Sequence, residues 1–283
     1  MHSNFEVITP ERALDLLTAN TNNRKLRPSV VARYAGAMAR GEWRPNGEAI
    51  KIAEDGTLLD GQHRLEACVE AEVPFETLIV TGLSKNSQQT MDGGLKRGTN
   101  DHLAFMGEKN TTVLASALRL IVEYEMYGTI GIRGGDAKLV TDPMLMAALD
   151  RHPHMRETVS STGLLRKMGA ITPSQTAALM YIMRSGPYQT QATLFFDQLK
   201  NGYMLTPDSP LLHLRNQVLG QTQSRLGAAR TAALTVKAWN SYVLERPMRQ
   251  LRWAPSEAFP EIEGSRVPVL GPEIVFGLSV EAE

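Results

Sequence analysis

The sequence contains one cysteine, Cys68, among 283 residues, and this scarcity excludes an internal disulfide and a zinc site built from several cysteines. It also lacks an excess of either charge, because 30 Lys and Arg residues balance 30 Asp and Glu residues. A zero net charge excludes a general basic field around the molecule, so any contact with DNA must come from local patches.

Long apolar runs are also missing. No stretch approaches the roughly 18 residues that a membrane-spanning helix needs. Residues 1–17 lack the basic and then apolar pattern of a secretion signal. A hydrophobic content of 42% and a charged content of 21% are ordinary for a globular protein. We therefore expect a cytoplasmic protein with no membrane partner.

The first third of the chain mixes short helical and strand patterns. Thr9 and Pro10 are typical of a helix start, as are Pro28 and Ser29. The other expected elements are a strand at 49–53, its return strand at 57–59, a helix at 64–71 and a strand at 75–81. Together they predict a compact α+β unit.

Strand patterns nearly disappear from Asn110 onward, and the sequence there predicts a helical bundle with short loops. Expected helices are 112–127, 143–151, 173–184, 191–201, 210–221 and 226–245. We place the domains at 1–105 and 106–253. An irregular acidic tail follows at 254–283, with one strand at 273–278.

The segment Asp60–Arg64 has the composition of an anion site. Gly61 permits a tight turn after a strand, and a helix that begins beyond it presents free N–H groups and a positive dipole end. His63 and Arg64 add donors, and Asp60 can cap the helix or hold a divalent metal. The alternative is a capped helix with a surface ion pair.

The wider segment LLDGQHRLEACVEAEVPFETLIV resembles the nucleotide motif of the ParB/sulfiredoxin superfamily, in its DGQHR-bearing branch of phage and actinobacterial proteins. Gly61, His63 and Arg64 match the sulfiredoxin pattern G-C-H-R, and Gly61, Arg64 and Ala67 match the ParB pattern G-E-R-R-x-x-A. The resemblance covers about the first 105 residues. It implies a small mixed sheet and a bound nucleoside triphosphate, ATP or CTP, with Mg²⁺. The phosphates would be bound by Gly61, Gln62, His63 and Arg64.

Gln62 stands where sulfiredoxins carry their cysteine, which excludes repair of sulfinic acids by a thiol at that point. Cys68 lies further along the same expected helix and has the character of a small buried residue. No acidic cluster has the spacing that two-metal phosphodiester cleavage requires, so the sequence does not support a nuclease.

Other positions complete the candidate site. Glu48 precedes the first expected strand and is a candidate general base and Mg²⁺ ligand beside Asp60. Arg24, Lys96 and Arg97 are candidate phosphate ligands, the last two within a glycine-rich turn that is equally compatible with a linker.

The end of the helical region carries Arg246, Arg249 and Arg252 close to tryptophans, a pattern compatible with nucleic-acid binding. The alternative is that the aromatic residues belong to the core, while the cations extend along the surface to solvent or pair with the acidic tail. His152 and His154 flank a proline without a third metal ligand, which predicts a surface loop.

The leading hypothesis is a nucleotide-binding ParB-like protein that acts on or with DNA, encoded by a phage or mobile element and working in the host cytoplasm. A second hypothesis is a Mg²⁺-dependent phosphotransferase or nucleoside triphosphate hydrolase with Glu48 as base. A third is a degenerate module that binds only DNA or protein. Assembly as a homodimer stays open.

Overall fold

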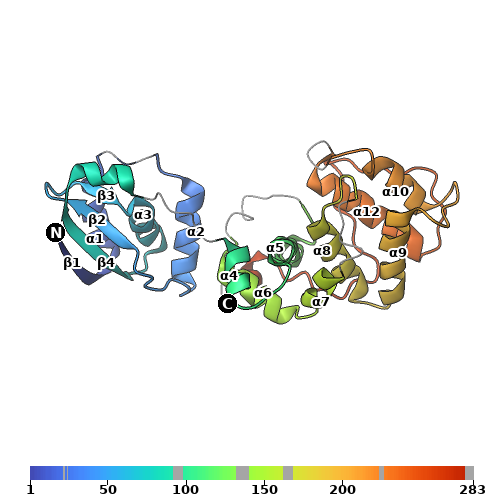
Figure 1. The fold of residues 1–283 in the computed structure, drawn as a ribbon, viewed down its shortest axis with the longest axis horizontal. Helices are drawn as coiled ribbons and strands as arrows, with labels where there is room; N and C mark the ends of the chain where they lie inside the picture. The colour runs from blue at the N-terminus through green and yellow to red at the C-terminus, as the bar shows by residue number, and fades with distance from the viewer. Residues whose placement is uncertain are drawn as a thin grey trace, which may run out of the picture. The chain divides into compact units, whose positions relative to one another are not determined.

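A computed structural model of the chain describes residues 1–21, 23, 25–91, 98–131, 140–161, 168–222 and 226–277, with the backbone alone for 88–90. The chain divides into two compact units. Unit 1 comprises Met1–Lys96 with Gly135–Pro143, and unit 2 comprises Arg97–Gly134 with Met144–Glu283. The α+β class expected from the sequence is confirmed, with the strands in unit 1 and most helices in unit 2 (Figure 1).

Unit 1 contains a four-stranded mixed sheet. Its strands are β1 (His2–Ile8), β2 (Ala49–Ala53), β3 (Leu58–Asp60) and β4 (Phe75–Leu83), in the order β1-β4-β2-β3. β4 pairs antiparallel with β1 and parallel with β2, and β2 pairs antiparallel with β3. The two edges of the sheet are therefore the first and third strands of the chain.

Three helices pack against this sheet: α1 (Pro10–Thr18), α2 (Pro28–Ala39) and α3 (Gln62–Ala71), and α3 contacts both of the others. A short 3₁₀ helix, η1, covers Lys85–Thr90. Their shared core is built from side chains of one sheet face and the helix faces opposite it, among them Ile8, Ile50, Phe75, Ile79, Leu16, Val31 and Leu65. This core fixes where α3 begins relative to β2.

The helix starts of unit 1 follow the expected capping chemistry. The Thr9 hydroxyl accepts a hydrogen bond from the backbone N–H of Arg12, and proline occupies the first turn of both α1 and α2. These two helices and strands β2, β3 and β4 confirm the sequence predictions. Strand β1 was not predicted, since HSNFEVI shows neither a turn signal before it nor a clear alternation.

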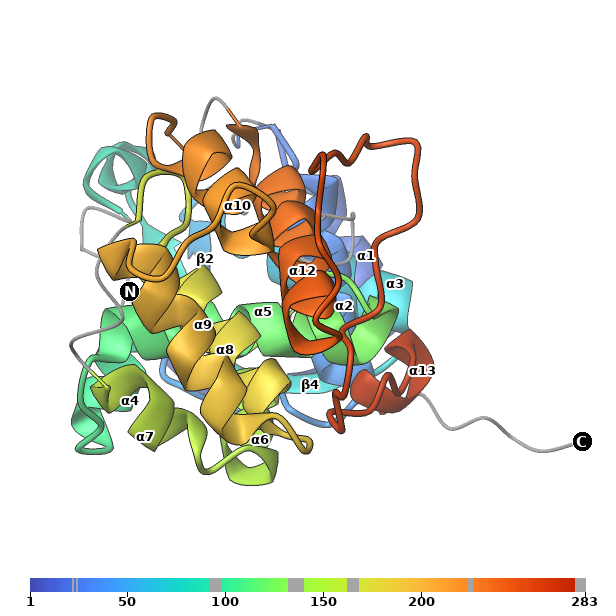
Figure 2. The ribbon, with the colours of Figure 1, turned by 90° about the vertical axis from the view of Figure 1, so that its right-hand side faces the viewer.

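Unit 2 is helical. Its elements are α4 (Thr99–Phe105), α5 (Thr111–Tyr127), α6 (Asp142–Arg151, which starts at the unit boundary), α7 (Met155–Ser160), α8 (Pro173–Arg184), α9 (Gln189–Asn201), α10 (Pro210–Val218), α12 (Ala228–Val243) and α13 (Pro272–Val275). Helices α8 and α9 lie side by side, and α8 also packs on α5 (Figure 2). The six helices expected from the sequence are present, and α4 and α7 are additional.

The segment after α12 has little regular structure, yet it belongs to the core of unit 2. Leu251, Trp253 and Ile262 are buried, and the indole N–H of Trp239 donates to the carbonyl of Glu263 at 3.1 Å. The strand expected at 273–278 is wrong in its described part: Pro272–Val275 form helix α13, because a glycine followed by proline favours a helix start.

Candidate functional site

The turn between β3 and α3 requires glycine. Gly61 has φ +112°, and a Cβ built on it would lie 2.4 Å from Cδ1 of Ile50 in the neighbouring strand. A side chain would therefore meet both a strained backbone conformation and an occupied position. The strand, glycine turn and helix that the sequence predicted are confirmed, with α3 starting at Gln62.

The first two side chains of α3 connect this helix to the two ends of the asparagine-rich loop between α1 and α2. The Oε1 atom of Gln62 accepts a hydrogen bond from Nδ2 of Asn20 at 3.1 Å. The Nε2 atom of His63 accepts one from the backbone N–H of Arg27 at 3.1 Å. Both residues are buried. Because His63 Nε2 is an acceptor here, it carries no proton to offer an anion in this tautomer.

The loop after α1 is held against the same turn by further bonds. Nδ2 of Asn23 donates to Oδ1 of Asn20 and to the carbonyl of Leu58, both at 2.7 Å. The N–H of Leu58 donates to the carbonyl of Ala19 at 3.0 Å. This loop therefore lies along β3 and the start of α3, and its asparagines place the turn.

Arg64 and Asp60 point toward β2. Nη2 of Arg64 donates to the carbonyl of Ala49 at 2.7 Å and lies 3.6 Å from Oδ2 of Asp60. Nζ of Lys51 lies 3.1 Å from the same carboxylate oxygen. The Asp60 carboxylate is thus neutralised by two cations, and it does not cap α3.

Arg64 also borders a small, shallow pocket that opens to solvent. The pocket is lined by Phe5, Trp43, Arg44 and Glu48 among others, so two candidate site residues, Glu48 and Arg64, meet there. Glu48 is exposed, and its backbone carbonyl accepts a hydrogen bond from the Thr77 hydroxyl at 3.0 Å. The pocket lining combines two aromatic residues with two arginines and two acidic residues, Glu48 and Glu76.

The remaining phosphate candidates, Arg24, Lys96 and Arg97, lie outside the described residues. Among the residues that are described, no group of three or more His, Cys, Asp and Glu side chains could hold a metal ion. A Mg²⁺ ion at Asp60 or Glu48 would therefore take most of its ligands from nucleotide phosphates and water.

In unit 2, Arg246, Arg249 and Arg252 are exposed and follow α12. The tryptophans near them are buried, Trp239 completely and Trp253 to 4% exposure. The aromatic rings therefore belong to the core, which is the alternative that the sequence left open, and the arginines alone face solvent. No helix in the described part of the chain has the length and apolarity to cross a bilayer.

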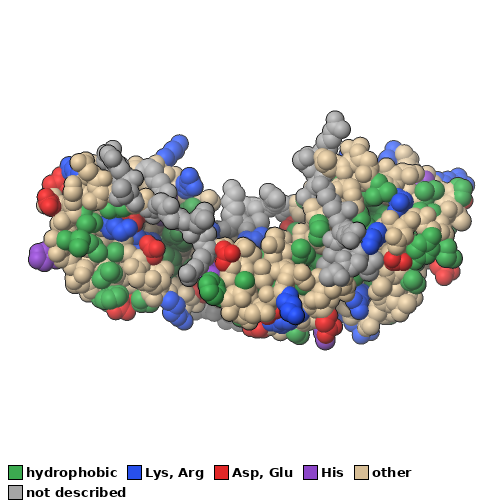
Figure 3. Space-filling view, viewed as in Figure 1, with side chains coloured by type: hydrophobic (Ala, Val, Ile, Leu, Met, Phe, Trp, Pro, Cys, Tyr) green, Lys and Arg blue, Asp and Glu red, His purple; other side chains and the backbone are tan. Residues whose placement is uncertain are grey.

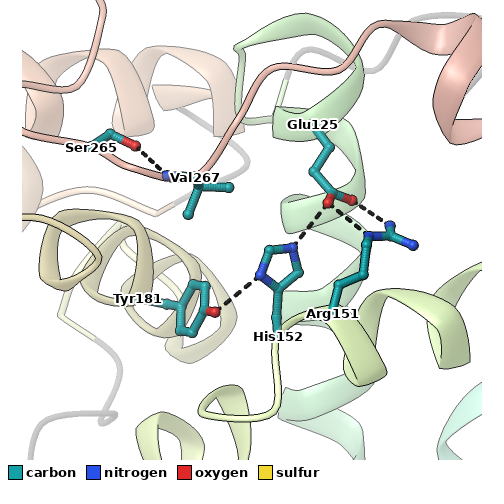
Figure 4. Close-up of polar contacts among 6 residues, drawn as sticks. All are labelled: Glu125, Arg151, His152, Tyr181, Ser265 and Val267. Atoms are coloured by element: carbon teal, nitrogen blue, oxygen red, sulfur yellow. Dashed lines mark hydrogen bonds and ion pairs between the residues drawn. The ribbon is translucent and has the colours of Figure 1, made fainter.

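A buried polar cluster of unit 2 was missed by the sequence analysis (Figure 4). The carboxylate of Glu125 on α5 is 1% exposed and accepts two hydrogen bonds from Arg151, at 3.1 and 2.7 Å. Nε2 of His152 lies 3.0 Å from the same carboxylate, and its Nδ1 lies 3.0 Å from the hydroxyl of Tyr181. Because a carboxylate only accepts, Nε2 carries the proton, and a neutral imidazole then accepts the Tyr181 O–H.

The surface loop predicted around His152 and His154 is therefore wrong for the first histidine, which is 7% exposed. Its carboxylate partner is 27 residues away in sequence, beyond the reach of a spacing argument. Burial raises the pKa of Glu125, but hydrogen bonds from His152 and Arg151 lower it further, so the pKa lies below its ordinary value. The cluster connects α5, the end of α6 and α8.

Comparisons with protein-family models, curated proteins and solved structures found no match to this chain. The argument for function therefore depends on the residues themselves.

Proposed function

We propose that unit 1 binds a nucleoside triphosphate, ATP or CTP, with Mg²⁺ at the start of α3, and that the protein uses this nucleotide while acting on or with DNA. The observation that carries the proposal is the meeting of Arg64 and Glu48 at one solvent-open pocket, with Arg64 in the first turn of the helix that follows Gly61. The resemblance of the Asp60–Arg64 segment to the ParB/sulfiredoxin superfamily supplies the nucleotide. It also suggests a phage or mobile element as the source of the gene.

The residues of the motif take separate roles in this proposal. Arg64 would face the anion with a forked guanidinium, and Arg44, which also lines the pocket, would be a second cation. Gly61 allows the sharp turn from β3 into α3 while Ile50 packs against it, and so it sets where α3 and Arg64 begin. Gln62 and His63, engaged with Asn20 and Arg27, hold α3 in place.

Calorimetry and thermal shift with ATP, CTP, GTP and ADP plus Mg²⁺ test the binding. Arg64→Ala and the exposed Arg44→Ala should each weaken binding at least about tenfold, because each removes a charge-assisted contact to phosphate. Lys85→Ala is the matched control: it removes one cation of an exposed ion pair with Asp55 elsewhere in unit 1. An absence of binding by the unmodified chain contradicts the proposal.

A second candidate function is phosphoryl transfer or nucleotide hydrolysis with Glu48 as base, favoured by the exposure of this carboxylate within the pocket. Phosphate release, measured with and without DNA, separates it from binding alone. Glu48→Gln should then reduce turnover at least about a hundredfold while nucleotide affinity stays within about twofold. Equal turnover by Glu48→Gln and the unmodified protein contradicts this role.

For DNA, the exposed cations Arg246, Arg249 and Arg252 are the proposed contact, through phosphates and not through stacking. Reversal of all three to Glu should abolish binding of a labelled duplex in fluorescence anisotropy. The control reverses three other exposed cations of unit 2: Lys109, Arg230 and Arg266. Equal losses in both triple variants would indicate a general charge effect. If the unmodified protein binds no nucleotide, and if the Arg64→Ala variant still binds DNA, the result would favour the third hypothesis, a degenerate module that binds only DNA or protein.

A further inference from the structure

Strand β1 forms one edge of the sheet in unit 1, with β4 on its inner side. No other strand of the described chain pairs with it. Its side chains from His2 to Phe5 are exposed, and Phe5 and Val7 retain 60% of their accessible surface. Unit 1, at the left of Figure 3, shows hydrophobic side chains dispersed among charged ones. β1 therefore presents to solvent both backbone groups without a strand partner and apolar side chains.

The two edges of this sheet are built differently. β3, at the other edge, has three residues and lies opposite a register shift in β2. β1 has seven residues in continuous register with β4, and it contains no proline, lysine or bulge. Short strands, bulges, proline and lysine are the means by which sheet edges avoid pairing. β3 has two of these protections, and β1 has none.

The sequence of β1 is complementary to itself when it is read antiparallel. With Asn4 facing Asn4 of a second copy, His2 lies opposite Glu6 and Ser3 lies opposite Phe5. This register places an acidic residue across from a basic one at both ends of the pairing. An ion pair with Arg12 holds the Glu6 side chain in place, because Nε of Arg12 lies 3.0 Å from Oε1 of Glu6.

We propose that β1 is a homodimerisation strand, pairing antiparallel with β1 of a second copy about a two-fold axis at Asn4. The two four-stranded sheets then form one continuous sheet. The occupant is a second copy because this register places the His2 imidazole of each copy opposite the Glu6 carboxylate of the other, where the two can form a hydrogen bond. This inference does not depend on nucleotide binding, because it concerns the backbone edge of β1, and of this strand only Phe5 lines the pocket.

The first test is a register-specific cross-link in the full chain. Asn4→Cys places two thiols face to face across the axis, so oxidation should produce a covalent dimer. His2→Cys is the control, because in this register its two Cα atoms are about 14 Å apart, beyond the span of a disulfide. The native Cys68 is fully buried and does not compete. Cross-linking that is equal at both positions, or absent at position 4, overturns the proposal.

The second test changes the charge at His2 without a cysteine. His2→Lys should keep or strengthen the dimer, and His2→Glu should weaken it about tenfold, because two symmetry-related pairs become repulsive. Light scattering after size exclusion gives the mass along a dilution series, and circular dichroism checks that the variants fold alike. A monomer at every concentration, or equal dissociation constants for the two variants, overturns the proposal.

Discussion

The imidazole of His63 accepts a hydrogen bond from the backbone N–H of Arg27, the N-cap residue of α2. The next residue, Pro28, has no N–H of its own, so Arg27 supplies the donor just before the helix begins. Since α2 lacks a side-chain cap, this bond from the start of α3 orients its entry. The conspicuous histidine of the motif is thus a structural residue of unit 1 even where a ligand binds beside it.

Replacement of His63 by Leu should destabilise the protein by about 1 kcal/mol, because it removes the acceptor of the part-buried hydrogen bond from the N–H of Arg27. Urea unfolding monitored by circular dichroism measures the change. His154→Leu is the control, since that side chain is 75% exposed and should change stability by less than about 0.5 kcal/mol. Equal stability of the two variants would contradict a structural role for His63.

Gly61→Ala should cost about 3 kcal/mol or more, because the new methyl group meets Ile50 and the residue stays at a positive φ. Gly56→Ala is a sharp comparison: it also has a positive φ, +85°, but nothing lies within 4 Å of its Cβ position. That variant should lose only about 1 kcal/mol. Thermal unfolding of the two variants separates the effect of the contact with Ile50 from that of backbone strain. Similar losses of stability in both variants would contradict a contribution from the contact with Ile50.

The buried carboxylate of Glu125 predicts acid sensitivity of unit 2. Its pKa in the folded protein lies below the ordinary 4.5, so the unfolded chain binds the proton more readily. The stabilisation by Glu125 is complete above pH 4.5, and it is lost as the pH falls through the pKa that this group has in the folded protein. Glu125→Gln should lose about 2 kcal/mol at neutral pH and show a flatter dependence of unfolding free energy on acid pH. Parallel pH curves for the two proteins would contradict this assignment.

Cys68 should resist modification in the native state. Its side chain is fully buried, and burial raises the pKa of the thiol to about 11, so little thiolate exists at neutral pH. A thiol reagent such as dithionitrobenzoate should react negligibly with the folded protein and with one thiol per chain in urea. Rapid stoichiometric reaction of the native protein would show that α3 opens readily.

The elements that the sequence predicted well are those that begin or end at characteristic capping or turn residues. Thr9, Pro28 and Thr172 stand at helix starts, and the hydroxyls of Thr9 and Thr172 accept backbone hydrogen bonds there. Gly61 announced the turn before α3 for the same reason, since a positive φ favours a residue without a side chain.

The features that the sequence did not predict depend on distant partners. β1 is stabilised by pairing with β4, whose paired residues lie 67 to 79 positions later along the chain, and its own residues show no strong pattern. His152 is buried because Glu125 and Tyr181 surround it. One signal was available: an acidic residue within the largely apolar run of α5 indicates a buried charge that needs a partner. The partner itself comes only from the tertiary structure.

The irregular segment after α12 has a consequence for the order of folding during synthesis. Trp239 is fully buried, and its indole is bonded to a carbonyl of that segment. The segment further along also donates two backbone N–H groups, from Leu270 and Gly271, to the carbonyl of Glu125 on α5. The core of unit 2 therefore cannot close until about 145 residues after α5 have left the ribosome, a delay of roughly 7 to 30 seconds at ordinary translation rates. During that interval α5, and α12 once it has been synthesised, expose apolar surface, a condition that favours binding by chaperones.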